Sequence, residues 1–449
     1  MAKYQKYAEY IDSGVEWLGE IPSHWDCFSG KRIFASVRKA AYETDQQLAA
    51  SQKYGVIPQK LMMELNDSKV MLALKGTDSF RHVDENNFVI SLRSFEGGIE
   101  YSEYTGCVSP AYTVLQNKKT ISYAYFKYLF KSAPYIAALQ STTDSLRDGK
   151  SISYEQFGAI PLPFCHVDEQ QGIATFLDHE TAKIDTLIAK QEKLIELLKE
   201  KRQAVISHAV TKGLNPNVPM KDSGVEWLGE VPEHWKVSKL KYESEVVDCR
   251  NKTPEYFDDG DYFVVRTTNV KNQQLNFNGA LYTDKKNFDI WTQRGIPPVG
   301  SILFTREAPT GEVCLVPEDL TFCMGQRMMN FIAHEKKYSD YLFDYLISDC
   351  LERYINSVSH GSTVTHLRVE QVENIPVLVP PQTEIKEIHL HILNIKNQFN
   401  KLEDKATQTI DLLKERRTAL ISAAVTGKID VHNWQHPNQN NNNNTELSA

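Results

Sequence analysis

The chain has 449 residues, of which 41% are hydrophobic and 24% are charged, and its formal net charge is −8. This length and composition indicate a globular protein of two to four domains, and no stretch approaches the roughly 20 apolar residues that a membrane helix needs. The seven cysteines form no CxxC pair and the N-terminus lacks the apolar segment of a signal peptide, so we expect a cytoplasmic protein without a disulfide framework.

The negative net charge taken alone argues against a nucleic-acid-binding protein. Net charge describes solubility and long-range fields, however, and does not say where the basic groups lie. The motifs along the chain therefore decide whether nucleic acid is a plausible partner.

Three segments of the chain recur in the same order. The first pair is identical over nine residues, and the other two pairs are closely similar. The matched pairs are residues 12–20 with 222–230, 155–161 with 370–376, and 199–211 with 414–426. Chance does not produce three collinear matches, so the chain is a tandem duplication.

Between the matched segments lie two inserts, residues 26–150 and 236–360, that show no similarity to each other. A conserved frame with two different inserts is typical of a scaffold that presents two independent readers. The alternative is a duplicated enzyme with one decayed half, but neither half shows catalytic residues.

Each insert is expected to be a mixed α/β domain. In the first insert we expect strands at Val108 and at residues 112–115, followed by helical spacing from Tyr123 to Leu139. In the second insert we expect strands at residues 263–265 and 301–305, followed by helical spacing from Tyr338 to Ile355.

A long amphipathic helix is predicted after each insert, over residues 168–210 and 383–425. Apolar residues recur there at alternating steps of three and four, which is the a/d seam of a coiled coil. The seam residues are Ile173, Leu177, Ile184, Leu187, Leu194, Leu198 and Val205 in the first helix, and Ile388, Ile392, Ile395, Phe399, Leu402, Ala406, Leu413 and Leu420 in the second. Gly213 and Gly427 mark the helix ends. Because a whole domain separates the two helices, we expect them to pack as an antiparallel coiled coil.

These features predict an α/β fold of two tandem, pseudo-symmetric domains separated by the two helices. The expected segments are a first domain (1–165), a central helix (166–213), a second domain (214–380), a C-terminal helix (381–430) and a disordered, Asn-rich tail (431–449).

A search for catalytic chemistry finds none. Residues 148–151 resemble the end of a phosphate-binding loop but lack its first glycine, and no glycine-rich cofactor loop or Asn/Asp-Pro-Pro-aromatic motif of a methyltransferase occurs. His389 and His391 lie two residues apart, on different faces of a helix, and are expected to be solvated and not to share a metal ion. We therefore expect no catalytic residue, no bound cofactor and no metal site.

Several motifs resemble those of the specificity subunits of type I restriction-modification enzymes. The repeated openers and helix endings are very similar to that family, and so are short segments in both inserts. These segments are residues 305–311, 325–327 and 361–363 in the second insert, and Gly106 with residues 109–112 in the first. The resemblance covers the chain up to Asp430.

The resemblance implies a non-catalytic, DNA-binding subunit with two target-recognition domains. Each domain would read one half-site of an asymmetric, bipartite double-stranded DNA target. The expected partners are two methyltransferase (M) subunits and one or two restriction (R) subunits, which would supply the sites for S-adenosylmethionine, ATP and Mg²⁺. The complex would serve DNA methylation and anti-phage defence.

Base edges are read by Arg, Asn, Ser and Thr side chains, while contacts to phosphates position the protein. The candidate DNA-binding residues are Lys75, Thr77, Arg81, Arg93, Ser94 and Tyr112 in the first domain, and Arg266, Thr268, Asn269, Arg306, Arg327 and Ser362 in the second. Two other functions stay open: a self-contained methyltransferase or nuclease, and a coiled-coil interaction protein that does not bind DNA.

Overall fold

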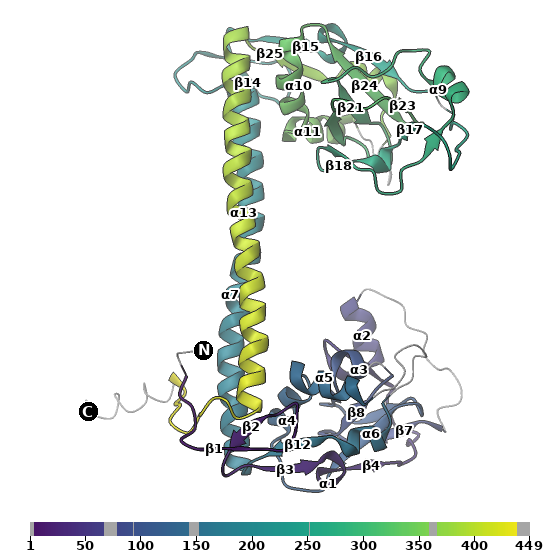
Figure 1. The fold of residues 1–449 in the computed structure, drawn as a ribbon. Helices are drawn as coiled ribbons and strands as arrows, with labels where there is room; N and C mark the ends of the chain where they lie inside the picture. Colours follow the sequence, from purple (N-terminus) through teal and green to yellow (C-terminus); the bar gives the residue numbers. More distant parts are fainter. Residues whose placement is uncertain are drawn as a thin grey trace, which may run out of the picture. The chain divides into compact units, whose positions relative to one another are not determined.

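The computed structural model describes residues 4–66, 79–92, 94–142, 152–250, 252–358 and 366–437 (Figure 1). The chain divides into two compact units. Unit 1 contains residues 1–191 and 408–449, and unit 2 contains residues 192–407. Among the described helices, none combines the length and apolar character needed to cross a membrane.

The elements of unit 1 follow one another between the N-terminus and the first long helix. They are β1 (Tyr10–Asp12), β2 (Glu20–Pro22), β3 (Asp26–Ser29), α1 (Gly30–Ile33), β4 (Phe34–Val37), β5 (Leu48–Ser51), β6 (Gly55–Pro58), α2 (Gln59–Asn66), β7 (Arg81–Val83), β8 (Phe88–Ile90), α3 (Ser94–Gly97), β9 (Glu100–Tyr101), β10 (Gly106–Val108), β11 (Thr113–Asn117), α4 (Tyr123–Leu129), α5 (Ala133–Ser141), α6 (Tyr154–Ala159) and β12 (Pro161–Phe164).

Unit 2 has a similar succession between the two long helices. Its elements are β13 (Met220–Asp222), β14 (Glu230–Pro232), β15 (Lys236–Lys239), α8 (Leu240–Glu243), β16 (Ser244–Asp248), β17 (Tyr262–Val265), β18 (Val270–Lys271), β19 (Gln274–Leu275), β20 (Tyr282–Thr283), α9 (Lys285–Trp291), β21 (Ile302–Thr305), β22 (Val313–Leu315), β23 (Phe322–Met324), β24 (Met328–Ala333), α10 (Ser339–Leu346), α11 (Asp349–Val358), α12 (Val369–Glu373) and β25 (Pro376–Val379).

The repeated opener folds as the same hairpin in both units. β1 pairs with β2 and β13 pairs with β14, in matching registers. The carboxylate of Asp12 accepts a hydrogen bond from the amide of Gly14, and Asp222 accepts one from Gly224, each at 3.0 Å. Both glycines have φ near +70°, a conformation that favours glycine. The identical sequence therefore gives an identical turn.

Each unit is built on a four-stranded antiparallel sheet of the same order. The order is β4-β11-β8-β9 in unit 1 and β16-β24-β21-β22 in unit 2. In both sheets the strand that comes fourth in the chain pairs between the first and the second. Unit 2 adds a second sheet in which β17 pairs parallel with β23. The expectation of mixed α/β domains with strands at these positions is confirmed.

Two helices were predicted longer than they are. The segment from Tyr123 to Leu139 forms two helices, α4 and α5. Pro134, in the first turn of α5, has no N–H to donate to the preceding turn, so α4 cannot continue through it. The segment from Tyr338 to Ile355 forms α10 and α11, and the Ser348 hydroxyl between them accepts a hydrogen bond from the amide of Cys350 at 3.2 Å.

The two long helices are α7 (Val167–Lys212) and α13 (Gln382–Val425), close to their expected bounds. In unit 1, Asp185 of α7 forms an ion pair with Arg417 of α13 at 2.9 Å, and Gly172 faces Val431, which follows α13. In unit 2, Arg202 contacts Glu403 at 3.1 Å, while Gly213 lies beside Glu384. In each unit the two helix segments therefore run antiparallel (Figure 1).

The predicted seam is buried only in part. Ile173, Leu177 and Ile184 are buried in unit 1, and Ile388 and Ile392 in unit 2, where the helices also touch the core of their unit. Leu187, Leu194 and Leu402 are exposed by 43–47%, against the prediction. Away from the cores each helix segment packs against one other helix, which covers a narrow stripe only.

In each unit one buried tryptophan holds the domain to the start of a long helix. Trp25 donates to Glu169 at the start of α7, and Trp235 donates to Glu384 at the start of α13, both at 2.9 Å. Trp17 and Trp227 of the repeated openers pack on Tyr135 of α5 and Tyr354 of α11.

The far ends of the helices are held in the same way in both units. The hydroxyl of Tyr125 donates to the carbonyl of Val425 at 2.8 Å, and that of Tyr341 donates to the carbonyl of Val210 at 2.7 Å. Gly213 and Gly427 follow at φ near +74°, the left-handed conformation expected after a helix. Each unit therefore joins the start of one long helix to the end of the other.

Candidate nucleic-acid interface

In unit 2, several of the predicted DNA-binding residues meet at one end of the sheet. β16 ends at Asp248, β21 ends just before Arg306, and β24 begins just after Arg327. The registers place these three chain positions at the same edge, because Thr305 pairs with Met328 and Asp248 pairs with Met329.

The charged groups at this edge form a connected network. The guanidinium of Arg306 lies 3.4 Å from Asp248, and the arginine is only 7% exposed. Arg327 is half exposed and contacts Glu307 at 3.0 Å, while His366 contacts the same carboxylate at 2.6 Å. The amide of Arg306 also donates to the carbonyl of Arg327 at 2.9 Å. Arg306 thus holds the loop together, and Arg327 remains accessible.

Two residues other than glycine have a left-handed backbone conformation, with positive φ, at this edge. Ala308 has φ +47° and Arg327 has φ +69°. Such conformations cost about 1–3 kcal/mol and tend to cluster where a loop must hold a defined shape for binding. The strain therefore marks the same edge as the charges.

The segment from Arg266 to Asn269 is built mainly by internal bonds. Asn269 is fully buried, accepts from the amide of Arg266 at 3.0 Å and donates to the carbonyl of Asn276 at 2.9 Å. The guanidinium of Arg266 donates to the carbonyl of Gly279 at 2.7 Å. Thr268 is exposed between them. Thr268 therefore keeps its side chain available, whereas Asn269 shapes the loop.

The corresponding sheet edge of unit 1 carries a different set of groups. Tyr112 precedes β11, and its carbonyl accepts a hydrogen bond from the guanidinium of Arg81. Burial, and next the charge of Arg38, lowers the pKa of Arg81. Ser94 is buried, and its hydroxyl accepts from the amide of Ser91 at 2.8 Å. The structure thus brings Arg81 and Tyr112 together and gives Ser94 a local structural bond.

Sequence reasoning missed basic residues that directly follow the first strand of each sheet. Arg38 and Lys39 follow β4 and are exposed, and Arg250 follows β16. Arg294 donates to the carbonyls of Asp248 and Cys249, both at 3.0 Å. A basic residue just after the first strand of the insert is a signal that the sequence offers. Lys75, Thr77, Arg93 and Ser362 lie outside the described residues.

Other predicted features also have defined places. His389 is not solvated as expected: its ring lies 2.7 Å from Asp344, which is 1% exposed. One group among the described residues could hold a metal ion, and it consists of His24, Glu169 and His432 in unit 1.

Comparison with known proteins gives matches over most of the chain. Residues 232–412 match a family model described as the type I restriction modification DNA specificity domain. The type I restriction enzyme MjaVIII specificity subunit of Methanocaldococcus jannaschii is 24% identical over 428 residues, which cover 92% of this chain and 95% of that protein.

Two solved structures share the fold. One is a chain from a structure that explains complex assembly and conformational transition of the type I R-M system. Its TM-score is 0.65 at 12% sequence identity, and the match covers 91% of this chain and 99% of that chain. The HsdS subunit from Thermoanaerobacter tengcongensis has a TM-score of 0.53 at 13% identity and covers 91% and 98%. The resemblance inferred from the motifs is confirmed.

Proposed function

We propose that this chain, which its sequence identifies as a non-catalytic specificity subunit of a type I restriction-modification system, reads a bipartite DNA target with one half-site for each unit. The observation that carries the proposal is that both units have a four-stranded sheet of the same strand order, while the loops at the edges of the two sheets are unrelated. The sheet edge at Arg81 and Tyr112 would read one half-site, and the edge at Thr268 and Arg327 would read the other.

The exposure of the side chains suggests a division of labour at these edges. Arg327, Thr268, Arg38 and Lys39 are accessible, so they are suited to contact bases or phosphates. Arg306 and Asn269 are buried, so they would shape the loops that carry the contacts. The net charge of −8 fits this arrangement if the partner subunits supply much of the affinity for phosphates.

The long helices would form an antiparallel coiled coil that sets the distance between the half-sites. Two M subunits would supply S-adenosylmethionine-dependent methylation, and R subunits would supply ATP- and Mg²⁺-dependent restriction. All of these partners act in the cytoplasm, where the proposal places this chain. The exposed leucines of the helices, such as Leu194 and Leu402, support a surface for partner subunits, since exposed apolar groups on a helix often mark contacts.

An exchange of one insert tests the proposal. Residues 26–150 are replaced by the insert of another specificity subunit, and the variant is purified with its M subunit. Mapping of methylated DNA motifs should show a change in one half-site and an unchanged second half-site. The matched exchange of residues 236–360 should give the reverse result. A simultaneous change in both half-sites would show that the units do not read independently, and an absence of DNA binding with the M subunit present would favour an interaction protein.

A further inference from the structure

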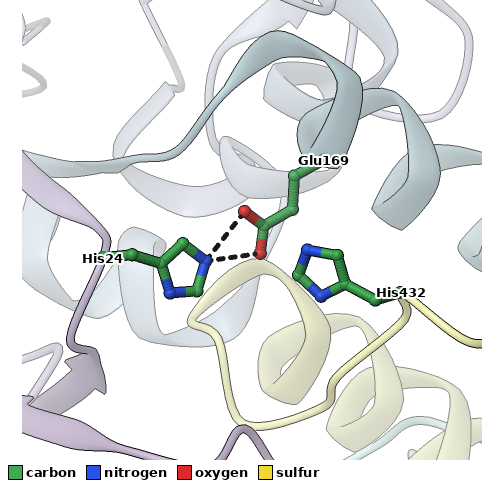
Figure 2. Close-up of side chains that lie close together, drawn as sticks. All are labelled: His24, Glu169 and His432. Atoms are coloured by element: carbon green, nitrogen blue, oxygen red, sulfur yellow. Dashed lines mark hydrogen bonds and ion pairs between the residues drawn. The ribbon is translucent and has the colours of Figure 1, made fainter.

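A cluster of two histidines and one carboxylate lies in unit 1, where the N-terminal segment, the start of α7 and the segment after α13 meet (Figure 2). One ligand-capable atom of each of His24, Glu169 and His432 lies within 4.8 Å of the other two. The imidazole nitrogen Nε2 of His24 is 3.0 Å from Oε2 of Glu169. We propose that these three residues bind a Zn²⁺ ion.

The two oxygens of Glu169 have different surroundings. Oε1 accepts hydrogen bonds from the hydroxyl of Tyr7 at 2.7 Å and from the indole of Trp25 at 2.9 Å. These donors fix the orientation of the Glu169 side chain, a residue that is only 9% exposed. The Nε2 atom of His24 lies 3.3 Å from Oε1 and 3.0 Å from Oε2, so both oxygens are within reach of an ion bound to His24. A metal ligand held by outer hydrogen bonds is typical of protein metal sites.

The ring of His432 is also held in place by a hydrogen bond. Its Nδ1 lies 2.7 Å from Oδ1 of Asp430, and Figure 2 shows the other ring nitrogen turned toward the Glu169 carboxylate. A carboxylate bound to the far nitrogen of a ligating histidine sets its tautomer and strengthens it as a ligand. Both histidine rings are about half exposed, so an ion can enter and the rings can adjust.

The distances and charges fit a small divalent ion. Ligand atoms around a tetrahedral Zn²⁺ lie about 3.3 Å apart, given bonds of about 2.0–2.1 Å. The pair His24–Glu169 is already near this separation, and His432 closes the site by a small movement of its ring. In the ion pairs of the described residues, Glu169 and Asp430 have only histidine partners, so with neutral imidazoles the cluster carries two negative charges that Zn²⁺ would balance. Imidazole and carboxylate ligands favour Zn²⁺ over Mg²⁺ or Ca²⁺.

Unit 2 supplies a natural comparison for the site. His234 and Trp235 contact Glu384 at 2.6 and 2.9 Å, as His24 and Trp25 contact Glu169. The turn that follows the helix is also the same, since the amide of Asn217 donates to Asn215 at 3.0 Å and that of His432 donates to Asp430 at 2.9 Å. Unit 2 therefore has the same histidine–glutamate–tryptophan contacts, but Asn217 stands in place of His432 and Asn215 in place of Asp430. The His–Glu–Trp contacts form in unit 2 without a second histidine, so they do not require His432, whose ring packs on Tyr7 and His24 with centroid distances of 5.7 and 6.1 Å.

A bound ion would join the two ends of the chain. It would link the segment around His24 to the segment around His432 across the first turn of α7, and so stabilise unit 1. This site was not predicted from the sequence, because its three ligands are 145 and 263 residues apart and follow no metal-binding spacing.

The test is a titration of the full-length, untagged chain with ZnSO₄ after treatment with a chelator. We expect saturation by a single ion, a rise in the melting temperature of unit 1, and visible absorption bands of a four-coordinate site when Co²⁺ replaces Zn²⁺. Asp430→Asn should weaken binding by about 10–100-fold. His432→Asn, which copies the residue of unit 2, should weaken it further, and both substituted positions are exposed or near the surface, so folding should persist.

The controls come from the chain itself. His234→Asn and His436→Asn should bind Zn²⁺ as the unsubstituted chain does. Equal affinity of the unsubstituted chain and His432→Asn would overturn the proposal, and so would an equally large loss in His234→Asn.

Discussion

Unit 1 and unit 2 have the same sheet order and the same attachments to the long helices, but their loops at the sheet edge differ. In unit 1 a two-stranded antiparallel sheet of β7 and β10 borders the edge, with buried His82 between Asp45 and Asp84 at 2.8 and 2.9 Å. In unit 2 an arginine–carboxylate network around Arg306 and Glu307 borders it. The residues that hold the frame are thus separate from the residues that distinguish the two edges.

This separation has a physical basis. Frame contacts such as Trp25 to Glu169 and Tyr125 to Val425 are buried hydrogen bonds, and a buried polar group that loses its partner costs about 1–3 kcal/mol. The edge residues lie at the open ends of strands, where a change in a loop leaves the ladder hydrogen bonds intact. The frame therefore tolerates little change, while the edges can vary.

The largest effect should come from ending the chain after Thr407. The deletion removes Leu420, Ile421 and Val425 from the core of unit 1, and each such side chain contributes about 1.5–3 kcal/mol to a domain that is stable by only about 5–15 kcal/mol. Hydrogen exchange should show protection lost in residues 4–191 and retained in residues 220–379. Equal loss in both units would mean that they do not fold separately.

Alanine substitution of the frame tryptophans should have a large effect confined to one unit. Trp25→Ala should destabilise unit 1, and Trp235→Ala should destabilise unit 2, each by about 3–5 kcal/mol, since both side chains are at most 2% exposed. Denaturation followed by hydrogen exchange in each unit measures this. Phenylalanine at the same positions should cost less, because the ring volume is largely kept; a similar cost would place the effect in the hydrogen bond to the glutamate.

Arg327→Ala should change recognition of one half-site with a smaller energy. If the guanidinium contacts a base, its loss should cost about 1–3 kcal/mol at one position of the second half-site and nothing at the first. Competition binding with the M subunit present, using DNA altered in one half-site at a time, measures the difference. Arg306→Ala, by contrast, should lower the stability of unit 2, because it leaves the Asp248 carboxylate without this partner. A uniform loss for all sequences in Arg327→Ala would assign that residue to a phosphate.

The smallest effect should be the contribution of His389 to the pH dependence of unit 2. The hydrogen bond from His389 to Asp344 raises the pKa of His389, so this pair stabilises the fold fully below the unfolded pKa of about 6.5 and loses its contribution as the pH rises through the folded pKa. The free energy of unfolding of unit 2, measured between pH 5 and 8, should therefore fall as the pH rises, and His389→Asn should reduce this fall. Unit 1 should lose stability in the same range for another reason, since burial raises the pKa of Glu100 to about 7, and His389→Asn should leave that loss unchanged. A fall in unit 2 that is the same in His389→Asn would point to another group.

The sequence predicted the helices well and the pairing of distant residues poorly. The bounds of α7 and α13 follow from heptad spacing and from Gly213 and Gly427, which are local signals. The positions of several strands followed from runs of apolar residues, but the order of the sheets depends on contacts between strands far apart in the chain. For the same reason the sequence could not show that Arg306 faces Asp248, 58 residues away, or that Leu187 and Leu194 are exposed. The DNA-binding roles of the candidate residues stay predictions.

Unit 1 is built from segments on both sides of unit 2 in the sequence, and this sets the order in which the two units can be completed on the ribosome. Residues 192–407 of unit 2 are synthesised between the two parts of unit 1. At about 5–20 residues per second, their translation takes on the order of tens of seconds. During this time the first 191 residues lack Leu420, Ile421 and Val425, which close their core. Unit 1 therefore begins to be synthesised before unit 2 but can complete its core only after it.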